Sequence, residues 1–172
     1  MKKILMFLIM MFITVLLVAC GDNETQLSDQ EVKELVHEYT VGEFAETVSA
    51  SIDSHELIVT EDGEETTFDL PKDEFFVSIA PFETFTHDCA IHSLTGCQGE
   101  LVEDVFDVKI TSETGEVIVD EEMTSFANGF IDLWLPRDGE YTVEIAKDGK
   151  VSEQTISTFE NDYTCITTMQ LL

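Results

Sequence analysis

The sequence predicts an α+β protein, in which a small N-terminal unit of helix and β-hairpin precedes an Ig-like antiparallel β-sandwich. Three observations predict this class. They are a capped amphipathic helix that begins after Ser28, a hairpin signal at residues 61–64, and a run of short β segments after residue 72. Helix in one part of the chain and strands in another are typical of α+β folds.

The first predicted element is a helix whose start is marked by a capping box. Ser28 is followed three residues later by Glu31, so that each side chain can bond the backbone of the other residue. The apolar stripe that follows at helical spacing consists of Val32, Leu35, Val36 and Tyr39. The same spacing predicts a second short helix after Gly42, from Phe44, Val48 and Ile52. We interpret both stripes as packing faces.

A β-hairpin is predicted after these helices. Two short β-type segments, residues 57–59 and 67–70, flank the sequence Glu-Asp-Gly-Glu at residues 61–64. The Asp-Gly pair suits a tight turn, because both residues tolerate a positive φ. The hairpin therefore completes a small N-terminal α+β domain over residues 28–72.

Residues 73–172 are predicted to form the β-sandwich, with the boundary at Pro71, Lys72 and Asp73. Buried and exposed positions alternate clearly in residues 130–135, as expected for a strand with one face in a core. The predicted strands are residues 75–80, 105–111, 116–120, 130–135, 141–146, 150–157 and 164–171. Strands at intervals of about ten residues with turn signals between them suggest Ig-like dimensions.

The first 19 residues are typical of a secretory signal peptide. Lys2 and Lys3 give a positive start, and the apolar run at residues 4–19 is short for a membrane span of about 20 residues. The sequence around Cys20 resembles the lipobox of bacterial lipoproteins, in which this cysteine is lipidated. Residues 20–27 then form a polar tether. The alternative is a single N-terminal anchor helix, and both place the remaining chain outside the cytoplasm.

The charge of the mature chain excludes nucleic acid as a partner. Removal of residues 1–19 takes two of the eight basic residues and no acidic one, which leaves six against 36 and a formal charge of −30. Affinity for nucleic acid depends on Lys and Arg that neutralise phosphates. The acidity keeps the protein soluble and fits adaptation to salty or alkaline surroundings, but it does not determine the fold.

One connection in the predicted sandwich is much longer than a hairpin loop. About two dozen residues without a clear period separate Ala80 from Val105, whereas hairpin loops usually need about 2 to 5 residues. Half of the four histidines and half of the four cysteines lie here, namely His87, Cys89, His92 and Cys97. The other histidines, His37 and His55, are each alone among acidic residues, and we expect them to be solvated.

The cysteine count favours a metal or redox site. With Cys20 lipidated, three cysteines remain, and an odd number does not suit a disulfide framework. Cys165 lies in the last predicted strand, which in a sandwich can lie beside the strand that leads into the long loop. Thiolates with one or two imidazoles favour Cu(I) or zinc over calcium or magnesium. The alternative is a disulfide, either Cys89–Cys97 or Cys97–Cys165, with histidines that have no role in the site. The C-x-x-C knuckle of a zinc finger is not present in the sequence.

Four stretches of the sequence carry a family resemblance. They are FFVSIAPF at residues 75–82, THDCAIHSLTGCQGEL at 86–101, FIDLWLPR at 130–137 and YTCITTMQL at 163–171. Over roughly residues 28–172 the chain resembles the CueP family of extracytoplasmic copper-binding proteins. The resemblance implies a small N-terminal domain, a β-rich C-terminal domain, and copper binding and reduction by three cysteines and a nearby histidine. It also implies delivery to a periplasmic superoxide dismutase, whereas the lipobox and the acidity depart from the family.

The sequence therefore predicts a copper-binding protein that is not an enzyme. It would buffer or deliver copper and confer copper resistance, and its thiols could reduce Cu(II) to Cu(I). The predicted ligands are Cys97 and Cys165 with Cys89 as the third, completed by His92 or, less favourably, His87.

Zinc is the second candidate metal. The predicted partners are copper ions, an extracytoplasmic cuproprotein that receives them, and the membrane through the lipid, and the resemblance adds a homodimer. Two alternatives remain open, a thiol redox protein and a cell-surface binding module with a structural disulfide or a structural zinc.

Overall fold

The capping box predicted at Ser28 begins the folded part of the chain. The computed structural model describes residues 27–172, and in it the Ser28 hydroxyl accepts the N–H of Glu31 while the Glu31 carboxylate accepts the N–H of Ser28. Helix α1 (Asp29–Val41) follows and ends where the Gly42 N–H bonds the Glu38 carbonyl. The predicted signal peptide and Cys20 lie outside the described residues, as does most of the predicted tether.

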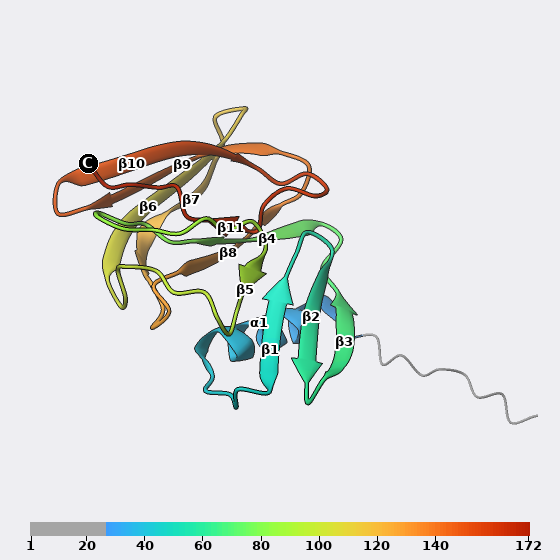
Figure 1. Cartoon of the computed structure of the whole chain (residues 1–172). Coiled ribbons are helices and arrows are strands. Elements are labelled where there is room, and N and C mark those ends of the chain that lie inside the picture. The colour runs from blue at the N-terminus through green and yellow to red at the C-terminus, as the bar shows by residue number, and fades with distance from the viewer. Residues whose placement is uncertain (1–26) are drawn as a thin grey trace, which may run out of the picture.

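Helix α1 packs against a four-stranded antiparallel sheet of order β3-β2-β1-β5 (Figure 1). The strands of this sheet are β1 (Val48–Ile52), β2 (Glu56–Glu61), β3 (Glu64–Asp69) and the two-residue β5 (His92–Ser93). The turn between β2 and β3 is the predicted Asp-Gly turn, and both Asp62 and Gly63 have a positive φ. The core between helix and sheet consists of Val32, Val36, Tyr39, Ala50, Ile52, Leu57, Val59, Leu70, Phe76 and Leu94.

The predicted second helix is wrong, because Val48–Ile52 forms strand β1. Positions 48 and 52 are four residues apart, and this spacing places two side chains on one face of a helix and also on one face of a strand. The hairpin decides between them, since β2 offers β1 a full antiparallel ladder from Val48↔Glu61 to Ile52↔Leu57. Ala50 and Ile52 are then buried under α1.

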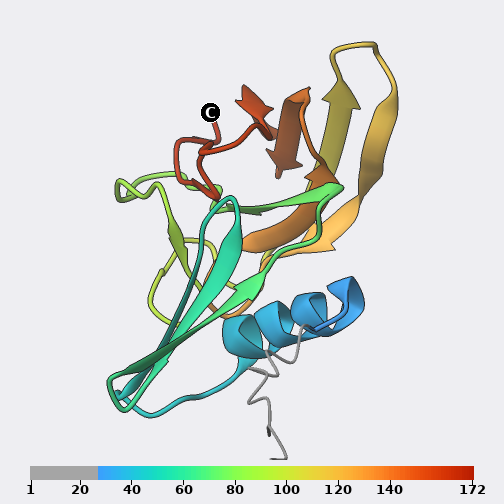
Figure 2. The same cartoon turned by 90° about the vertical axis from the view of Figure 1, so that its right-hand side faces the viewer.

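The predicted β-sandwich is confirmed, and it consists of two packed sheets (Figures 1 and 2). One sheet has the order β10-β9-β6-β7 and the other β11-β4-β8. Their strands are β4 (Glu74–Ile79), β6 (Val105–Ser112), β7 (Val117–Thr124), β8 (Ile131–Pro136), β9 (Glu140–Lys147), β10 (Lys150–Ser157) and β11 (Cys165–Ile166). Alternate residues of β6, β8 and β9 are buried between the sheets, and for β8 the alternation of residues 130–135 predicts this.

The last predicted strand, residues 164–171, is much shorter in the structure. Only Cys165 and Ile166 form strand β11, and this strand runs parallel to β4, whereas the other strand pairs are antiparallel. A separate bridge joins Gln170 to Phe82, and the backbone between these contacts leaves the ladder. Met169 and Leu171 still enter the sandwich core, so the apolar pattern of residues 164–171 reflects burial without a continuous strand.

Strand β8 joins the sandwich to α1 through a buried carboxylate. The Asp132 carboxylate accepts hydrogen bonds from the hydroxyls of Ser78 on β4, at 2.5 Å, and Thr40 on α1, at 2.9 Å. Burial raises the pKa of Asp132, although both hydroxyls favour its charged form. Trp134, on the same face of β8, packs against the helix core. Phe76 and Leu94 lie after the predicted domain boundary at residues 72 and 73, yet they belong to the core between α1 and its sheet. The boundary stays a prediction.

Two glycines fix the end of the long loop against the turn before β8. The Gly99 N–H bonds the Asn128 carbonyl at 2.7 Å, and a Cβ on Gly129 would lie 2.8 Å from the Gly99 Cα. Gly129 also has a φ of +79°, a conformation that costs other residues free energy. No helix within residues 27–172 is long and apolar enough to span a membrane.

We predict that Gly129→Ala destabilises the fold much more than Gly149→Ala. Gly149 has a similar φ of +81° with nothing within 4 Å of an added Cβ, so it measures the backbone cost alone, about 1 kcal/mol. The backbone clash at Gly129 should add at least about 2 kcal/mol. Urea denaturation of both variants measures the difference, and equal midpoints would contradict the close approach.

Candidate metal centre

The parallel pairing of β11 with β4 brings Cys165 to the start of the long loop. Cys165 lies opposite Ser78, and the Ser78 N–H bonds the Thr164 carbonyl at 2.8 Å. The Ala80 N–H then bonds the Ile166 carbonyl at 2.9 Å, so the contact continues to the point where the chain leaves β4. This placement confirms the expectation that the last strand lies beside the strand that leads into the loop.

The loop is held over Cys165 by backbone bonds and one hydroxyl. The Ala90 carbonyl accepts the N–H groups of both Thr164 and Cys165, at 3.1 and 3.3 Å. The Thr164 hydroxyl accepts the His92 N–H at 3.1 Å and donates to the Ile52 carbonyl at 2.6 Å. Since His92 also pairs with Ile52 in the β5–β1 ladder, Thr164 fixes His92 and Cys165 relative to each other.

A tight turn after β5 returns Cys97 to the same place. The Cys97 N–H bonds the Ser93 carbonyl at 3.0 Å, and the Ser93 N–H points to the Cys97 sulfur at 3.4 Å. The Cys97 sulfur lies 3.6 Å from the Cys89 sulfur. A disulfide requires about 2.05 Å, and the three cysteines within residues 27–172 are free thiols.

The structure brings all five predicted loop and strand residues together around Cys97. The nearest donor atoms of His87, Cys89 and Cys97 lie within 4.8 Å of one another, and those of His92, Cys97 and Cys165 do the same. Sulfurs bound to one ion at about 2.3 Å lie roughly 4 Å apart, so each group has a spacing that suits a single soft ion. Cys20, the predicted lipidation site, lies outside the described residues.

His92 is the least accessible member of the cluster and lacks hydrogen-bond partners for its ring. Its exposed fraction is 0%, and neither ring nitrogen has a partner among the described residues. The ring lies against Phe130, with 4.6 Å between ring centroids, and near Phe76. Buried polar atoms are normally hydrogen-bonded, because their desolvation otherwise costs about 1–3 kcal/mol. An unpartnered imidazole nitrogen next to thiols therefore fits a metal ligand.

The three thiols differ in their readiness to ionise. The neighbouring thiol of Cys165 lowers the pKa of Cys97, desolvation opposes this, and the His92 ring and the Ser93 N–H lower it further. The neighbouring Cys97 raises the pKa of Cys165, and burial adds to the rise. Burial also raises the pKa of Cys89. Cys97 is therefore the first thiol of the cluster to become a thiolate, the form that attacks disulfides and binds metals.

The cluster opens to solvent on the side of Cys89. A cleft of about 530 Å³ is lined by Asp88, Cys89, Tyr163, Cys165 and Thr168, among others. Cys89 is partly exposed and His87 is exposed, with its ring 6.4 Å from the Phe130 centroid. His37 and His55 are exposed and belong to neither group of donors, as predicted.

Comparison with known proteins identifies the family. The sequence model described as periplasmic copper-binding protein CueP matches residues 31–170. The chain belongs to the CueP family. A crystal structure of S.CueP is similar to this chain, with a TM-score of 0.78 and 40% sequence identity over 82% of this chain and 88% of that one. No match is found among curated proteins.

Membership of the CueP family confirms the resemblance and supports copper as the bound metal and an extracytoplasmic location. The likeness to S.CueP agrees with the α+β fold. The choice of Cu(I) over zinc, the ligand set, the lipid anchor, the recipient protein and the homodimer stay predictions.

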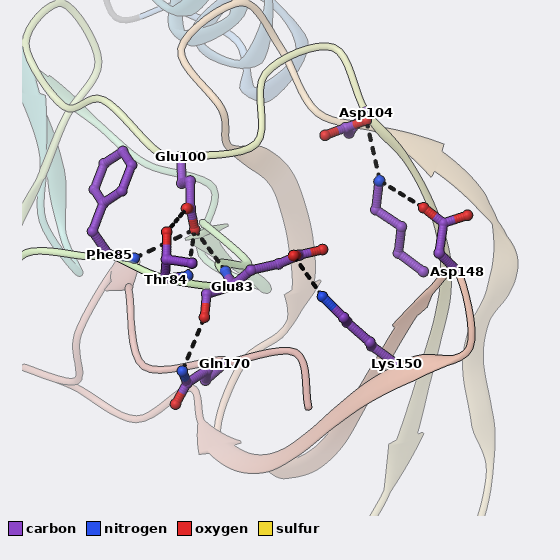
Figure 3. A network of polar contacts seen from close by, with 9 residues as sticks. Glu83, Thr84, Phe85, Glu100, Asp104, Asp148, Lys150 and Gln170 are labelled. Atoms are coloured by element: carbon purple, nitrogen blue, oxygen red, sulfur yellow. Dashed lines mark hydrogen bonds and ion pairs between the residues drawn. The ribbon is translucent and has the colours of Figure 1, made fainter.

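Two side chains that the sequence analysis does not identify hold the long loop between β4 and β6 of this CueP family member in place. Thr164 is one of them, and the only sequence signal for its role is its position directly before Cys165. Glu100 is the other: its carboxylate accepts the N–H groups of Glu83, Thr84 and Phe85 at 2.6, 2.9 and 3.5 Å, and also the Thr84 hydroxyl (Figure 3). These bonds close the base of the loop, because they join residues before His87 to residues after Cys97.

The start of the loop is also bonded to the C-terminal part of the sandwich. In Figure 3 the Glu83 carboxylate accepts Lys150 at 2.5 Å, and the Glu83 carbonyl accepts the Gln170 amide at 3.0 Å. Partial desolvation disfavours the charged form of Glu100, but the Thr84 hydroxyl and the backbone N–H groups outweigh it and lower its pKa to about 2. The Glu100 carboxylate is therefore ionised in the folded protein at neutral pH.

We predict that Glu100→Gln destabilises the protein at neutral pH and has less effect in acid. A lowered pKa in the folded state stabilises the fold above the unfolded value of about 4.3, and this contribution is lost as the pH falls through about 2. The gap in urea midpoint between wild type and Glu100→Gln should thus narrow from pH 6 to pH 3. Glu113→Gln, at an exposed turn, is the control, and a gap that is independent of pH would contradict the role of the charge.

We predict that Thr164→Val loosens the metal centre and that Thr164→Ser restores it. Valine has a similar shape but leaves the His92 N–H and the Ile52 carbonyl without the hydroxyl, at a cost of about 1–3 kcal/mol. Copper affinity should fall with stability in the valine variant, and both should return in the serine variant. Competition with a Cu(I) chelator and urea denaturation measure the two effects. Equal behaviour of valine and serine would show that the hydroxyl has no role.

Proposed function

We propose that this CueP family member is a lipid-anchored extracytoplasmic protein that buffers copper and passes it to a cuproprotein. One observation carries the proposal: three free thiols and a buried imidazole without hydrogen-bond partners converge around Cys97. Soft sulfur donors with nitrogen favour Cu(I) and disfavour calcium and magnesium. The family match, which is to a periplasmic copper-binding protein, supports the same metal.

The proposed ligands of Cu(I) are Cys97, Cys165 and His92, with Cys89 and His87 as further donors beside them. Cys97 is central because its sulfur belongs to both groups of donor atoms. The walls formed by Ala80 and Phe130 are apolar, which limits access of water to a bound ion. Zinc is the alternative metal, because it accepts the same sulfur and nitrogen donors, usually four of them in tetrahedral geometry.

The same thiols could reduce incoming Cu(II). Two thiols, Cys89 and Cys97, would give one electron each to two Cu(II) ions, release two protons, and form one S–S bond. The products are two Cu(I) ions and a disulfide, so another reductant must restore the thiols before a second round. The 3.6 Å between these sulfurs supports the pairing. We treat this reaction as stoichiometric, and we do not propose an enzyme.

Two other functions use the same residues. A thiol redox protein would use the close pair Cys89 and Cys97, for which the 3.6 Å spacing and the lowered pKa of Cys97 are favourable. A surface binding module would use a structural disulfide or zinc, but this leaves His92 or the third thiol without a role. Copper binding uses all of these groups, and we therefore prefer it.

We predict that Cys97→Ser weakens Cu(I) binding most among the single cysteine variants. Loss of the shared sulfur removes a donor from both groups, so affinity should fall by at least about 100-fold, a change of about 2.8 kcal/mol. Cys165→Ser should be nearly as severe and Cys89→Ser milder. Anaerobic titration with Cu(I) against a chelator measures this, with His55→Ala as the control. Retained binding in the triple Cys→Ser variant would exclude the proposed site, and stronger binding of zinc than of Cu(I) would favour the zinc alternative.

We predict that Cys20→Ser releases the protein from the membrane. The lipobox-like sequence before Cys20 is the basis for the anchor. Cell fractionation and mass spectrometry of the native protein should find a lipidated residue 20 at the N-terminus in the membrane fraction. A chain that begins at Met1 with an unmodified Cys20 would contradict the anchor.

A further inference from the structure

We infer that copper passes through two stations that share Cys97, an outer one for exchange and an inner one for storage. The outer station consists of His87, Cys89 and Cys97, and the inner one of His92, Cys97 and Cys165. The inference rests on the proposed function, and it goes beyond it by giving the two histidines different roles. It follows from the arrangement of the donors, their burial and the position of the cleft.

The donors form two sets of three, and one residue belongs to both. Within each set the nearest donor atoms lie within 4.8 Å of one another, and the Cys89 and Cys97 sulfurs are 3.6 Å apart. Cu(I) is satisfied by two or three soft donors, so each set can hold one ion without help from the other. Two complete ligand sets around a common sulfur are more than a single storage site requires.

The two stations differ sharply in access. His87 is exposed. Cys89 and Cys165 both line the cleft of about 530 Å³, but only Cys89 is partly exposed there. In the inner station His92 is 0% and Cys165 is 1% exposed. An external ligand or a donor protein can therefore reach copper on the outer station, while copper on the inner station is covered by the loop and by Phe130.

The transfer between stations is a ligand exchange without a change in the oxidation state of copper. Cu(I) gives up the Cys89 sulfur and a His87 nitrogen, and it gains the Cys165 sulfur and a His92 nitrogen. The Cys97 sulfur stays bound, so the ion is never released. The proton that the Cys165 thiol loses is matched by the proton that Cys89 gains, and the total charge of protein and copper is unchanged.

This arrangement separates rate from affinity. A station that lies on the path of the ion but holds little of it at equilibrium affects capture and release by the same factor. A station that holds the ion at equilibrium determines the dissociation constant. His87 should therefore control how fast copper exchanges, and His92 should control how tightly it is held.

The test compares His87→Ala, His92→Ala and the control His55→Ala in the purified protein with Cu(I) under anaerobic conditions. Competition with bicinchoninate gives the dissociation constant, and stopped-flow transfer to and from the same chelator gives the two rates. We expect His92→Ala to raise the dissociation constant at least about tenfold with an unchanged rate of capture. We expect His87→Ala to slow capture and release about tenfold each, with a dissociation constant within about threefold of wild type.

X-ray absorption of the copper-loaded proteins adds a readout that does not depend on rates. The nitrogen ligand of Cu(I) should persist in His87→Ala, where His92 supplies it, and in His92→Ala, where His87 of the outer station supplies it. It should disappear only in the double variant. A loss of affinity in His87→Ala equal to that in His92→Ala would overturn the two stations in favour of a single site, and behaviour of His87→Ala like His55→Ala would remove the outer one. Failure of the wild-type protein to bind Cu(I) would instead overturn the proposed function itself.

Discussion

The candidate metal centre depends on the short parallel pairing of β11 with β4. Two residue pairs, Cys165↔Ser78 and Ile166↔Ile79, hold the end of the chain beside the strand from which the long loop departs. The Thr164 hydroxyl extends this contact to β1 and β5, so three separate parts of the chain meet at one side chain. The position of Cys165 relative to His92 follows from these bonds and from the Ala90 carbonyl, which accepts the N–H groups of Thr164 and Cys165.

The cluster combines groups that are each unfavourable to bury. Burial raises the pKa of Cys89, and the neighbouring Cys97 thiol raises that of Cys165, so both thiols resist ionisation. The His92 ring has no hydrogen-bond partner among the described residues. A bound cation would remove both problems, because it displaces thiol protons and accepts the imidazole lone pair. Keeping these thiols and the imidazole buried together costs stability in the metal-free protein, and a bound cation would offset this cost.

Much of this arrangement could be predicted from residue order, and the failures have physical causes. The capping box, the Asp-Gly hairpin and the alternating strands are local signals, and they are confirmed. The spacing of positions 48 and 52 also fits a helix, because the two residues share a face in both structures, whereas they form strand β1. The end of the chain was predicted as a full strand because Met169 and Leu171 are apolar, although only Cys165 and Ile166 pair with β4. The convergence of the five donors was expected, whereas Thr164 and Glu100 depend on contacts between distant segments that no local pattern shows.

Strand β5 has a second consequence, which concerns self-association. Its two residues, with Leu94 and Thr95, occupy the hydrogen-bonding edge of β1, which would otherwise end the sheet of the N-terminal part of the chain. Exposed sheet edges can pair with other chains and start aggregation. The segment that carries His92 and Cys97 thus also serves as a protective edge strand. Any opening of the loop wide enough to detach β5 would expose an unpaired sheet edge. In the proposed function, copper would therefore leave through small side-chain movements while the backbone stays in place.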